Sequence, residues 1–528
     1  MELVEPSLCL YESVHASYFF FIFIILILFL LLGLLSFTTL FIFLLLKRSK
    51  LSCKCEICHC YVTSSWSKNY QNVCDWYTHL LQNSPSKTIH IHVLDNIITA
   101  NPKNVEYILK TNFNNYPKGK HFSTILGDLL GHGIFNVDGD AWRFQRKMAR
   151  VELDRFSVRS YSFQVVKEEI DKQLILYLYA KVSNHVVDLQ EIFRAFSLIT
   201  ISKISFGVNF ESLQELVGSS KDFSTSFDLA TRLSAERALE VCSFSWKLKR
   251  LLGLGKEQKL RNAIKEVNLV AMKIIKQRRN KLNSTNDHDL IEDQKDLLSR
   301  FMKNGYNNND GYLRDIIVSF LLAGRDTVAS AITSLIMLIA HHPRVEEKIL
   351  LEANKVLGEE QGICKYDQIV ELNYLQATIF ESMRLYPPVQ FDSKYAENDD
   401  ILPDMNTKVM KGSRVTYHPY AMGRMEMIWG KDCLEFKPER WLKNGVFFQE
   451  DCYKYPVFQA GVRVCLGKEM ALMEIKCVAI CLLREFHFEL VDNNDFCKVP
   501  KFSPGLTATF LGGLPVLLHA RKKQTSHG

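Results

Sequence analysis

The residues best suited to chemistry in this chain surround one cysteine, in the loop from Phe458 to Gly467. We expect Gly461 and Gly467 to let the backbone turn tightly and approach a flat ligand without a Cβ clash. A helix is predicted from Lys468, so its free N–H groups and positive dipole end should favour the anionic thiol of Cys465. Because the loop contains no histidine to serve as a base, a metal ligand is favoured over a nucleophile.

The loop reads F-x-x-G-x-R-x-C-x-G, and this pattern resembles the haem-binding loop of the cytochrome P450 monooxygenases. The resemblance implies that Cys465 is the axial ligand of the iron of haem b. It also implies that Phe458, Gly461, Arg463 and Gly467 contact the cofactor, with Arg463 as a fixed cation for a haem propionate. A buried, unreactive cysteine is the alternative.

A second motif pairs Trp142 with Arg146 on a predicted helix. Residues four apart share a helix face, so an indole N–H and a guanidinium can both reach one anionic group. This W-x-x-x-R pattern resembles the family's helix that holds a haem propionate, with simple packing as the alternative. Lys394 stands near the place where the family often holds the other propionate, and an exposed lysine is the alternative there.

A third motif, Ala323 to Thr327, interrupts the longest helix predicted after the N-terminal apolar run, Leu313 to Ala340. A mid-helix glycine costs about 1 kcal/mol relative to alanine, so we expect a ligand close to Gly324 to compensate. The sequence resembles the family's A-G-x-D-T motif for oxygen activation. It implies that Ala323, Gly324 and Thr327 line the haem, and that Asp326 and Thr327 deliver protons to dioxygen. A helix kink is the alternative.

A structural network is predicted from Glu381, Arg384 and Arg440, which match the family's E-x-x-R and P-E-R-F elements. Trp441 replaces the phenylalanine of the second element. We expect these side chains to clamp the core beneath the haem, because an exposed pair alone would contribute little.

Resemblance extends to a group of plant enzymes over residues 381–393, 415–425 and 455–461. These stretches are similar to the fatty-acid ω-hydroxylases, a group that also oxidises jasmonoyl-isoleucine at its terminal carbon. The Cys-rich entry segment, residues 323–329 and residues 504–509 look closest to the branch that carries 12-hydroxyjasmonoyl-isoleucine to the 12-carboxylate. By family position the candidate pocket residues are Phe122, Leu129, Phe320, Ala323, Val389 and Leu506. We also hypothesise that Lys118 or Lys120 meets the substrate carboxylate, against the alternative of a surface lysine.

An uncharged apolar run over residues 18–46 is long enough to cross a bilayer. Acidic residues precede it and Lys47, Arg48 and Lys50 follow it, which predicts a cytosolic catalytic domain. A cleavable signal peptide would carry its basic residues first. We therefore expect a lumenal N-terminus (1–17), a transmembrane anchor (18–46), a basic linker with cysteines (47–87) and a monooxygenase domain (88–528), as a single-pass protein of the endoplasmic reticulum.

The linker contains Cys53, Cys55, Cys58 and Cys60, and the spacing of Cys55 and Cys58 is typical of a zinc ligand pair. A second pair at finger distance is missing, so we expect no metal here. Zinc and palmitoylation are the alternatives.

Composition narrows the function classes. Net charge is +7, but the densest basic run, Lys273 to Lys281, lies on a predicted amphipathic helix, so nucleic-acid binding is not expected. The 14 cysteines lack a regular framework, which indicates a reducing compartment. No G-x-G-x-x-G motif follows a strand and no flavin motif is present, so NADPH electrons must come through a separate NADPH–cytochrome P450 reductase. A haem-thiolate isomerase or dehydratase, or a membrane-tethered scaffold without haem, remains the alternative.

The predicted fold is mainly α with small β-sheets, behind an N-terminal transmembrane helix. Residues 114–140 are rich in Gly, Asn and Asp, so we expect mostly loop, with Asp140 capping the next helix. Near the C-terminus, apolar runs on both sides of Gly512 and Gly513 predict a hairpin.

Overall fold

A computed structural model describes residues 21–40, 53, 55–182, 185–209, 212–217, 223–240, 243–284, 296–303, 309–358, 365–404, 407–491 and 500–521. The chain forms two compact units, residues 1–63 with 91–95, and residues 64–90 with 96–528. The predicted lumenal N-terminus, both ends of the predicted anchor and residues 47–52 lie outside the described residues.

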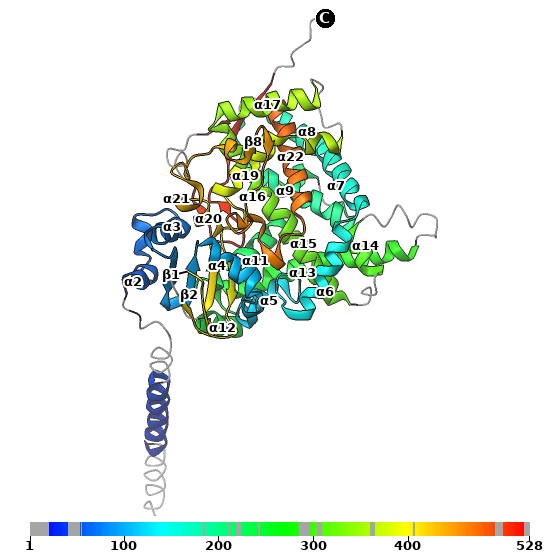
Figure 1. Cartoon of the computed structure of the whole chain (residues 1–528). Coiled ribbons are helices and arrows are strands. Elements are labelled where there is room, and N and C mark those ends of the chain that lie inside the picture. The colour runs from blue at the N-terminus through cyan, green and yellow to red at the C-terminus, as the bar shows by residue number, and fades with distance from the viewer. Residues whose placement is uncertain are drawn as a thin grey trace, which may run out of the picture. The chain divides into compact units, whose positions relative to one another are not determined.

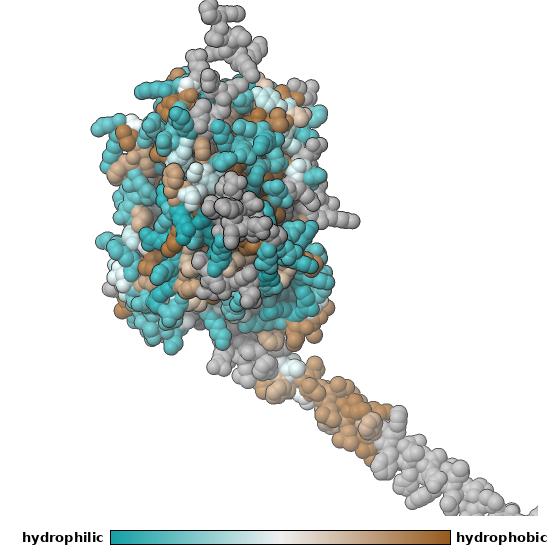
Figure 2. Space-filling model, turned by 90° about the vertical axis from the view of Figure 1, so that its right-hand side faces the viewer, coloured by the Kyte–Doolittle hydropathy of each residue, from teal (hydrophilic) through white to brown (hydrophobic). Residues whose placement is uncertain are grey.

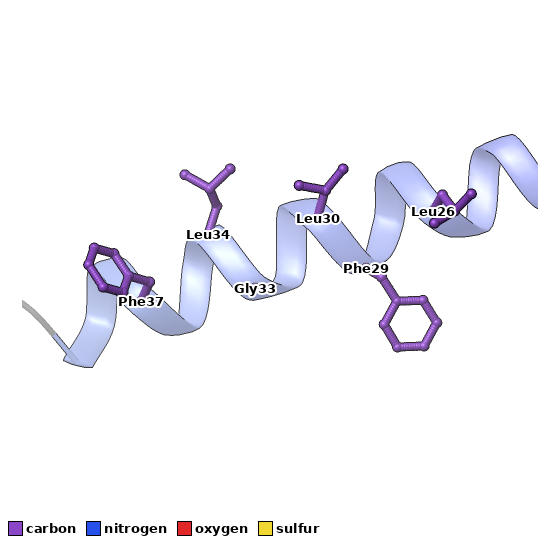
Figure 3. A pocket seen from close by; sticks show the side chains of 6 residues that line it. All are labelled: Leu26, Phe29, Leu30, Gly33, Leu34 and Phe37. Atoms are coloured by element: carbon purple, nitrogen blue, oxygen red, sulfur yellow. The ribbon is translucent and has the colours of Figure 1, made fainter.

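The first unit contains the helix Phe21–Leu40, whose mean hydropathy of 3.0 and full exposure suit it to a membrane. Figure 2 shows this helix covered by hydrophobic side chains. A shallow hollow on it lies where Gly33 has no side chain (Figure 3). The unit also contains α2 (Glu56–Val62) and the short 3₁₀ turn η3 (His92–Leu94).

The second unit is mainly helical, as predicted. Its α-helices are α3 (Val73–Asn83), α4 (Pro102–Glu106), α5 (Gly119–Leu130), α6 (Gly139–Leu153), α7 (Phe156–Glu169), α8 (Ile175–Tyr179), α9 (Leu189–Phe206), α10 (Leu213–Leu216), α11 (Phe223–Arg237), α12 (Ser243–Leu252), α13 (Gly255–Ser284), α14 (Leu297–Phe301), α15 (Asp310–Leu321), α16 (Thr327–Ala340), α17 (Pro343–Leu357), α18 (Tyr366–Val370), α19 (Asn373–Leu385), α20 (Pro419–Met422), α21 (Glu426–Trp429) and α22 (Lys468–Glu485). Short turns used below are η4 (Tyr107–Thr111) and η9 (Leu322–Asp326), both π-helical, and the 3₁₀ turns η10 (Pro438–Trp441), η11 (Pro456–Phe458) and η12 (Gly461–Arg463).

The strands are short and form small sheets. They are β1 (Thr88–Ile91), β2 (Asn96–Thr99), β3 (Val187–Asp188), β4 (Asp392–Tyr395), β5 (Asp400–Ile401), β6 (Lys408–Val409), β7 (Arg414–Tyr417), β8 (Leu442–Lys443), β9 (Val446–Phe447), β10 (Phe486–Leu490), β11 (Phe502–Ser503), β12 (Thr509–Phe510) and β13 (Pro515–Ala520). The largest sheet has the order β1-β2-β7-β4, in which β7 runs parallel to β2 and antiparallel to β4. A second sheet has the order β10-β13-β3.

The core of the second unit is built around α16, which contacts α9, α19 and α22. Figure 1 shows α9, α16 and α22 together in the middle of the helical unit. Residues 328–339 of α16 are all buried. A helix that is apolar on every side must be enclosed by others. This explains why Asp310–Ala340 has the composition of a membrane span, although 78% of its most apolar 18-residue stretch is buried.

Three local predictions were wrong. Residues 114–140 contain α5, because Ile125, Leu126, Leu129 and Leu130 give it a buried apolar face. The N-cap of α6 is Asp138 rather than Asp140.

The predicted C-terminal hairpin is also absent from the described residues, since β12 pairs with β11 and β13 pairs with β10 and β3. Gly513 instead allows close packing on Asp188, where an added Cβ would lie 2.0 Å from a carboxylate oxygen.

Candidate active site

The loop that carries Cys465 is closed by its own backbone. The N–H of Cys465 donates to the carbonyl of Phe458 at 2.8 Å, and the N–H of Val464 donates to the carbonyl of Gly461 at 3.3 Å. The loop ends at Gly467, the N-cap of α22. These bonds fix the direction of the cysteine side chain, and Cys465 is an exposed residue.

The electrostatics of the thiol only partly match the prediction. The N–H of Gly467 donates to the sulfur of Cys465, as expected of a helix start, and this bond lowers its pKa. The guanidinium of Arg146 acts in the same direction. Although solvent reaches this residue, desolvation by the protein atoms packed around the sulfur outweighs both and raises the pKa of the Cys465 thiol. In the protein alone the thiol therefore stays protonated, and a bound metal cation would be needed to hold the thiolate.

Gly461 makes a tight turn, as predicted, and also packs against another part of the chain. Its φ is +61°, and a Cβ there would lie 2.2 Å from the carbonyl oxygen of Leu109 in η4. Close approach to the protein backbone therefore requires glycine at this position. At Gly467, by contrast, an added Cβ would meet no atom of the described residues within 4 Å, and the φ of −88° is open to other residues.

Two arginines and one tryptophan meet beside the cysteine loop. The guanidinium of Arg463 lies 4.3 Å from the ring centre of Trp142, and that of Arg146 lies 5.6 Å from it. Arg146 donates to the carbonyl of Val464 at 2.7 Å. Arg463 donates to Asp138 at 2.6 Å, while its buried Nε has no hydrogen-bond partner among the described residues. A buried donor without a partner fits an added anionic group.

Lys394 lies in the same region, on β4. Its ammonium is almost fully buried and donates to Asp392 at 2.7 Å. Burial lowers the pKa of Lys394 to about 7 against the pull of Asp392, and the charges of Lys118 and Arg463 act in the same direction as burial. An exposed lysine is therefore the wrong alternative for this position.

Lys118 also belongs to this cluster and not to the surface. Only 8% of the residue is exposed, and its ammonium pairs with Asp392. Burial acts to raise the pKa of Asp392, but the two lysines outweigh it and hold that pKa well below its usual range. Lys118 already has a carboxylate partner, whereas Lys120 is exposed in the first turn of α5. The structure therefore separates the two lysines that the sequence left equivalent.

The predicted oxygen-activation motif forms a π-helical turn, η9, between α15 and α16. The hydroxyl of Thr327 donates to the carbonyl of Ala323 at 2.5 Å, as a hydroxyl that opens the helical ladder should. Gly324 faces α9, where an added Cβ would lie 2.4 Å from the side chain of Ile201. Helix packing on this side therefore requires glycine at position 324.

Asp326 is held by a buried arginine to which the sequence motifs assigned no role. Its carboxylate accepts from Arg325 at 2.6 Å, and Arg325 also donates to Asp228 of α11 at 2.5 Å. Arg325 is fully buried, whereas the side chain of Asp228 is 34% exposed. Burial raises the pKa of Asp326 and Arg325 opposes that rise. The pair of carboxylates on one guanidinium forms a polar path from η9 towards solvent.

The predicted network around Glu381 is present. Arg384 binds the carboxylate through two bonds of 2.8 Å, and Arg440 binds it at 2.9 Å. Arg384 also donates to the carbonyls of Cys433 and Glu435 at 2.6 and 2.8 Å. This network joins α19 to η10 and the segment before it, beneath the residues that lead into the cysteine loop.

The candidate pocket residues come from three places in the second unit. Phe122 and Leu129 lie on α5, and Phe320 lies on α15. Val389 and Leu506 lie on two segments that a backbone hydrogen bond joins. The N–H of Ala508 donates to the carbonyl of Pro388 at 2.8 Å. Leu129 is fully buried, and the other four are partly exposed.

Sequence reasoning missed the roles of four site residues: Asp138, Arg325, Asp392 and Trp441. Arg325 and Asp392 lie next to residues that the sequence did predict as functional. Their charge at these positions was the signal that could have indicated a role. Asp138 gave no signal, because its partners Arg463 and the N–H groups of Lys118 and Gly119 are distant in sequence or not recognisable from it.

Comparisons with known proteins agree with these arrangements. The cytochrome P450 family model matches residues 65–510. Cytochrome P450 94C1 of Arabidopsis thaliana is 53% identical over 474 residues, covering 89% of this chain and 94% of that protein. Cytochrome P450 94B1 of the same plant is 44% identical over 470 residues, covering 87% and 89%. Cytochrome P450 94A1 of Vicia sativa is 39% identical over 467 residues, covering 87% and 88%.

These matches settle the family and its general chemistry. Family members bind haem iron and use dioxygen with NADPH-derived electrons that a reductase supplies. A redox partner and a small-molecule substrate follow from that chemistry. The chain therefore belongs to the cytochrome P450 family and is a haem-thiolate monooxygenase.

Proposed function

We propose that this monooxygenase inserts oxygen at the terminal carbon of an apolar substrate that carries a carboxylate at its other end. Jasmonoyl-isoleucine and its 12-hydroxy product are the preferred substrates, with free fatty acids as a further class. The similarity to the 94 group of cytochromes P450 supports this choice. The observation that carries the cofactor assignment is the exposed Cys465 beside Arg463, whose Nε is buried without a partner among the described residues.

The residues present fit a haem. Cys465 would hold the haem iron through its sulfur, and the backbone bonds that close its loop restrict where this side chain can lie. Trp142, Arg146, Arg463 and Lys394 supply donors and positive charge for the propionates. Phe458, Ala323 and the backbone around Gly461, Gly467 and Gly324 complete the surroundings. When bound, a thiolate-ligated haem supplies oxygen activation through strong electron donation from sulfur.

Proton delivery falls to Thr327 and Asp326. The hydroxyl of Thr327 can leave the carbonyl of Ala323 and donate into the groove of the π-helical turn. Asp326 would relay the protons, while Arg325, which stays charged and also binds the partly exposed Asp228, would position the carboxylate of Asp326.

Substrate orientation falls to the pocket residues and one lysine. Phe122, Leu129, Phe320, Val389 and Leu506 offer apolar contacts that suit an alkyl chain. Lys120 is the better candidate for the carboxylate, because Lys118 is paired with Asp392. The variant Lys120→Ala should have a higher KM for a carboxylic acid substrate than wild type, and the same KM for the methyl ester of that acid. Equal KM values for the acid in wild type and variant would show that Lys120 does not bind the carboxylate.

We further propose that the helix Phe21–Leu40 anchors the protein in the endoplasmic reticulum, with the catalytic unit in the cytosol beside an NADPH–cytochrome P450 reductase. The basic residues that follow the apolar run support this topology. The sequon Asn283-Ser284-Thr285 provides a test, since glycosylation there in cells would place the catalytic unit in the lumen.

The decisive experiment for the haem site is a carbon monoxide difference spectrum of the reduced protein. Wild type should give the long-wavelength Soret band of a thiolate-ligated haem, and Cys465→Ala should lose it. Cys452→Ala, which removes a partly exposed thiol shortly before the loop, should keep it. A retained band in Cys465→Ala would refute the assignment.

The substrate is tested separately. Microsomes that contain the protein and reductase receive NADPH and each candidate acid, and the products are identified by mass spectrometry. Terminal hydroxylation of jasmonoyl-isoleucine supports the proposal, and further conversion to the carboxylate would indicate successive oxidations. Oxidation only at internal carbons would overturn it.

A further inference from the structure

Three cysteines and a histidine gather in the first unit: Cys53, Cys55, Cys58 and His92. Their sulfur and imidazole nitrogen atoms all lie within 4.8 Å of one another. The sulfur of Cys55 lies 3.8 Å from Nδ1 of His92. Zn–S and Zn–N bonds of about 2.3 and 2.0 Å place the ligands of a tetrahedral ion about 3.5–3.8 Å apart. The pair Cys55 and His92 is already at this distance, and every other pair is at most about 1 Å wider, so small side-chain shifts would bring all four atoms around a single ion.

Backbone hydrogen bonds support two of the sulfurs. Cys55 is the N-cap of α2, and the N–H of Cys58 donates to its sulfur at 3.5 Å. The N–H of Val93, in η3, donates to the sulfur of Cys58. Donors of this kind stabilise negative sulfur and orient it, which is the role of outer contacts in metal sites. The second bond also joins the two segments of the first unit that supply the ligands.

The other uses of these cysteines fit the geometry less well. A disulfide would engage two sulfurs and leave the third sulfur and the imidazole without a reason to converge. Palmitoylation requires an accessible thiol, and Cys58 is fully buried. A single tetrahedral ion accounts for all four side chains together.

We propose that Cys53, Cys55, Cys58 and His92 bind one structural Zn²⁺ ion. Three thiolates and one imidazole are a common structural zinc set, and with four protein ligands no position is open to substrate. The ion closes a loop of chain that begins soon after the membrane helix and ends between β1 and β2. It holds α2 and η3 together, and it takes no part in the haem chemistry.

The metal content of the purified full-length protein tests the proposal directly. Elemental analysis by mass spectrometry should find one zinc ion per haem in wild type. Cys55→Ser/Cys58→Ser and His92→Ala should each lower this ratio at least fivefold. Cys60→Ser and His59→Gln are the matched controls: they remove a thiol and an imidazole from α2 that lie outside the cluster, and they should keep the zinc.

A second measurement uses wild type alone, so it does not depend on how a variant folds. N-ethylmaleimide should modify Cys60 at once, and should modify Cys53 and Cys55 only after a chelator has removed the metal. The carbon monoxide spectrum, recorded in parallel, reports whether the haem unit of each variant is intact. Zinc absent from wild type, a disulfide or an acyl chain on these cysteines, or equal labelling with and without chelator would overturn the proposal.

Discussion

The indole N–H of Trp441 donates to the carboxylate of Glu381 at 2.9 Å, inside the network formed by Arg384 and Arg440. Both partners are fully buried. Where the family motif has phenylalanine, the tryptophan of this chain therefore adds a donor to a buried carboxylate. The carboxylate gains a hydrogen bond that phenylalanine cannot provide.

Replacing that donor should cost stability. Trp441→Phe should lower the free energy of unfolding by about 1–3 kcal/mol, since a buried carboxylate loses one of its donors and a smaller ring leaves a void. Thermal unfolding of the haem-loaded protein measures the change. Trp66→Phe, at a partly exposed indole stacked on Trp76, is the control and should shift the midpoint less. Equal shifts for the two variants would argue against the hydrogen bond as the cause.

Gly461 should be intolerant of any side chain. Gly461→Ala forces a Cβ to 2.2 Å from the carbonyl of Leu109 at a φ of +61°, so we expect a loss of about 3 kcal/mol or more. Gly445→Ala is the matched control, because its φ is +79° but nothing lies within 4 Å of the added Cβ. That control should lose about 1 kcal/mol. Thermal unfolding measures both, and similar losses would show that strain alone, rather than the contact with Leu109, matters.

Thr327 should determine how much product is formed for each NADPH consumed. Thr327→Ala removes the hydroxyl that bonds to Ala323, so product formation should fall by about 10²-fold while NADPH consumption continues. Thr333→Ala removes the same kind of bond, 2.7 Å to the carbonyl of Ala329, further along α16 and should leave the ratio of product to NADPH unchanged. An unchanged ratio in Thr327→Ala would exclude its role in proton delivery.

Glu474 should make stability depend on pH. Burial raises the pKa of Glu474 from 4.5 to about 7, with a hydrogen bond from Thr200 at 2.8 Å opposing the rise. Between those two values the folded protein keeps a proton that the unfolded chain has released. Stability from this group is therefore present below pH 4.5 and lost as pH rises through 7, by about 3 kcal/mol in total.

The variant Glu474→Gln should remove that pH dependence, as seen by comparing unfolding midpoints of variant and wild type from pH 5 to pH 8. Glu469→Gln, exposed in the first turn of the same helix, should keep the wild-type profile. A parallel shift of the Glu474→Gln curve at every pH would contradict the assignment to this carboxyl.

The spacing of residues within short stretches of the sequence was sufficient to predict much of the site. The position of Cys465 between Gly461 and a helix start, the pairing of Glu381 with Arg384 one turn later, and the long helix that carries Thr327 all follow from contacts within a few residues. The apolar run that includes Phe21–Leu40 is equally readable, because membrane thickness sets its length. The sequence by itself thus determined the family, its haem cofactor and the mainly helical fold.

Only the tertiary structure decided which remote residues share an environment. Positions 324 and 461 require glycine because Ile201 and Leu109 pack against them, and neither of these residues is near them in sequence. Lys118 is buried and forms an ion pair with Asp392. His92 lies close to three cysteines that come well before it in the sequence. Spacing cannot reveal such contacts, because they depend on how elements pack and not on the period of any one element.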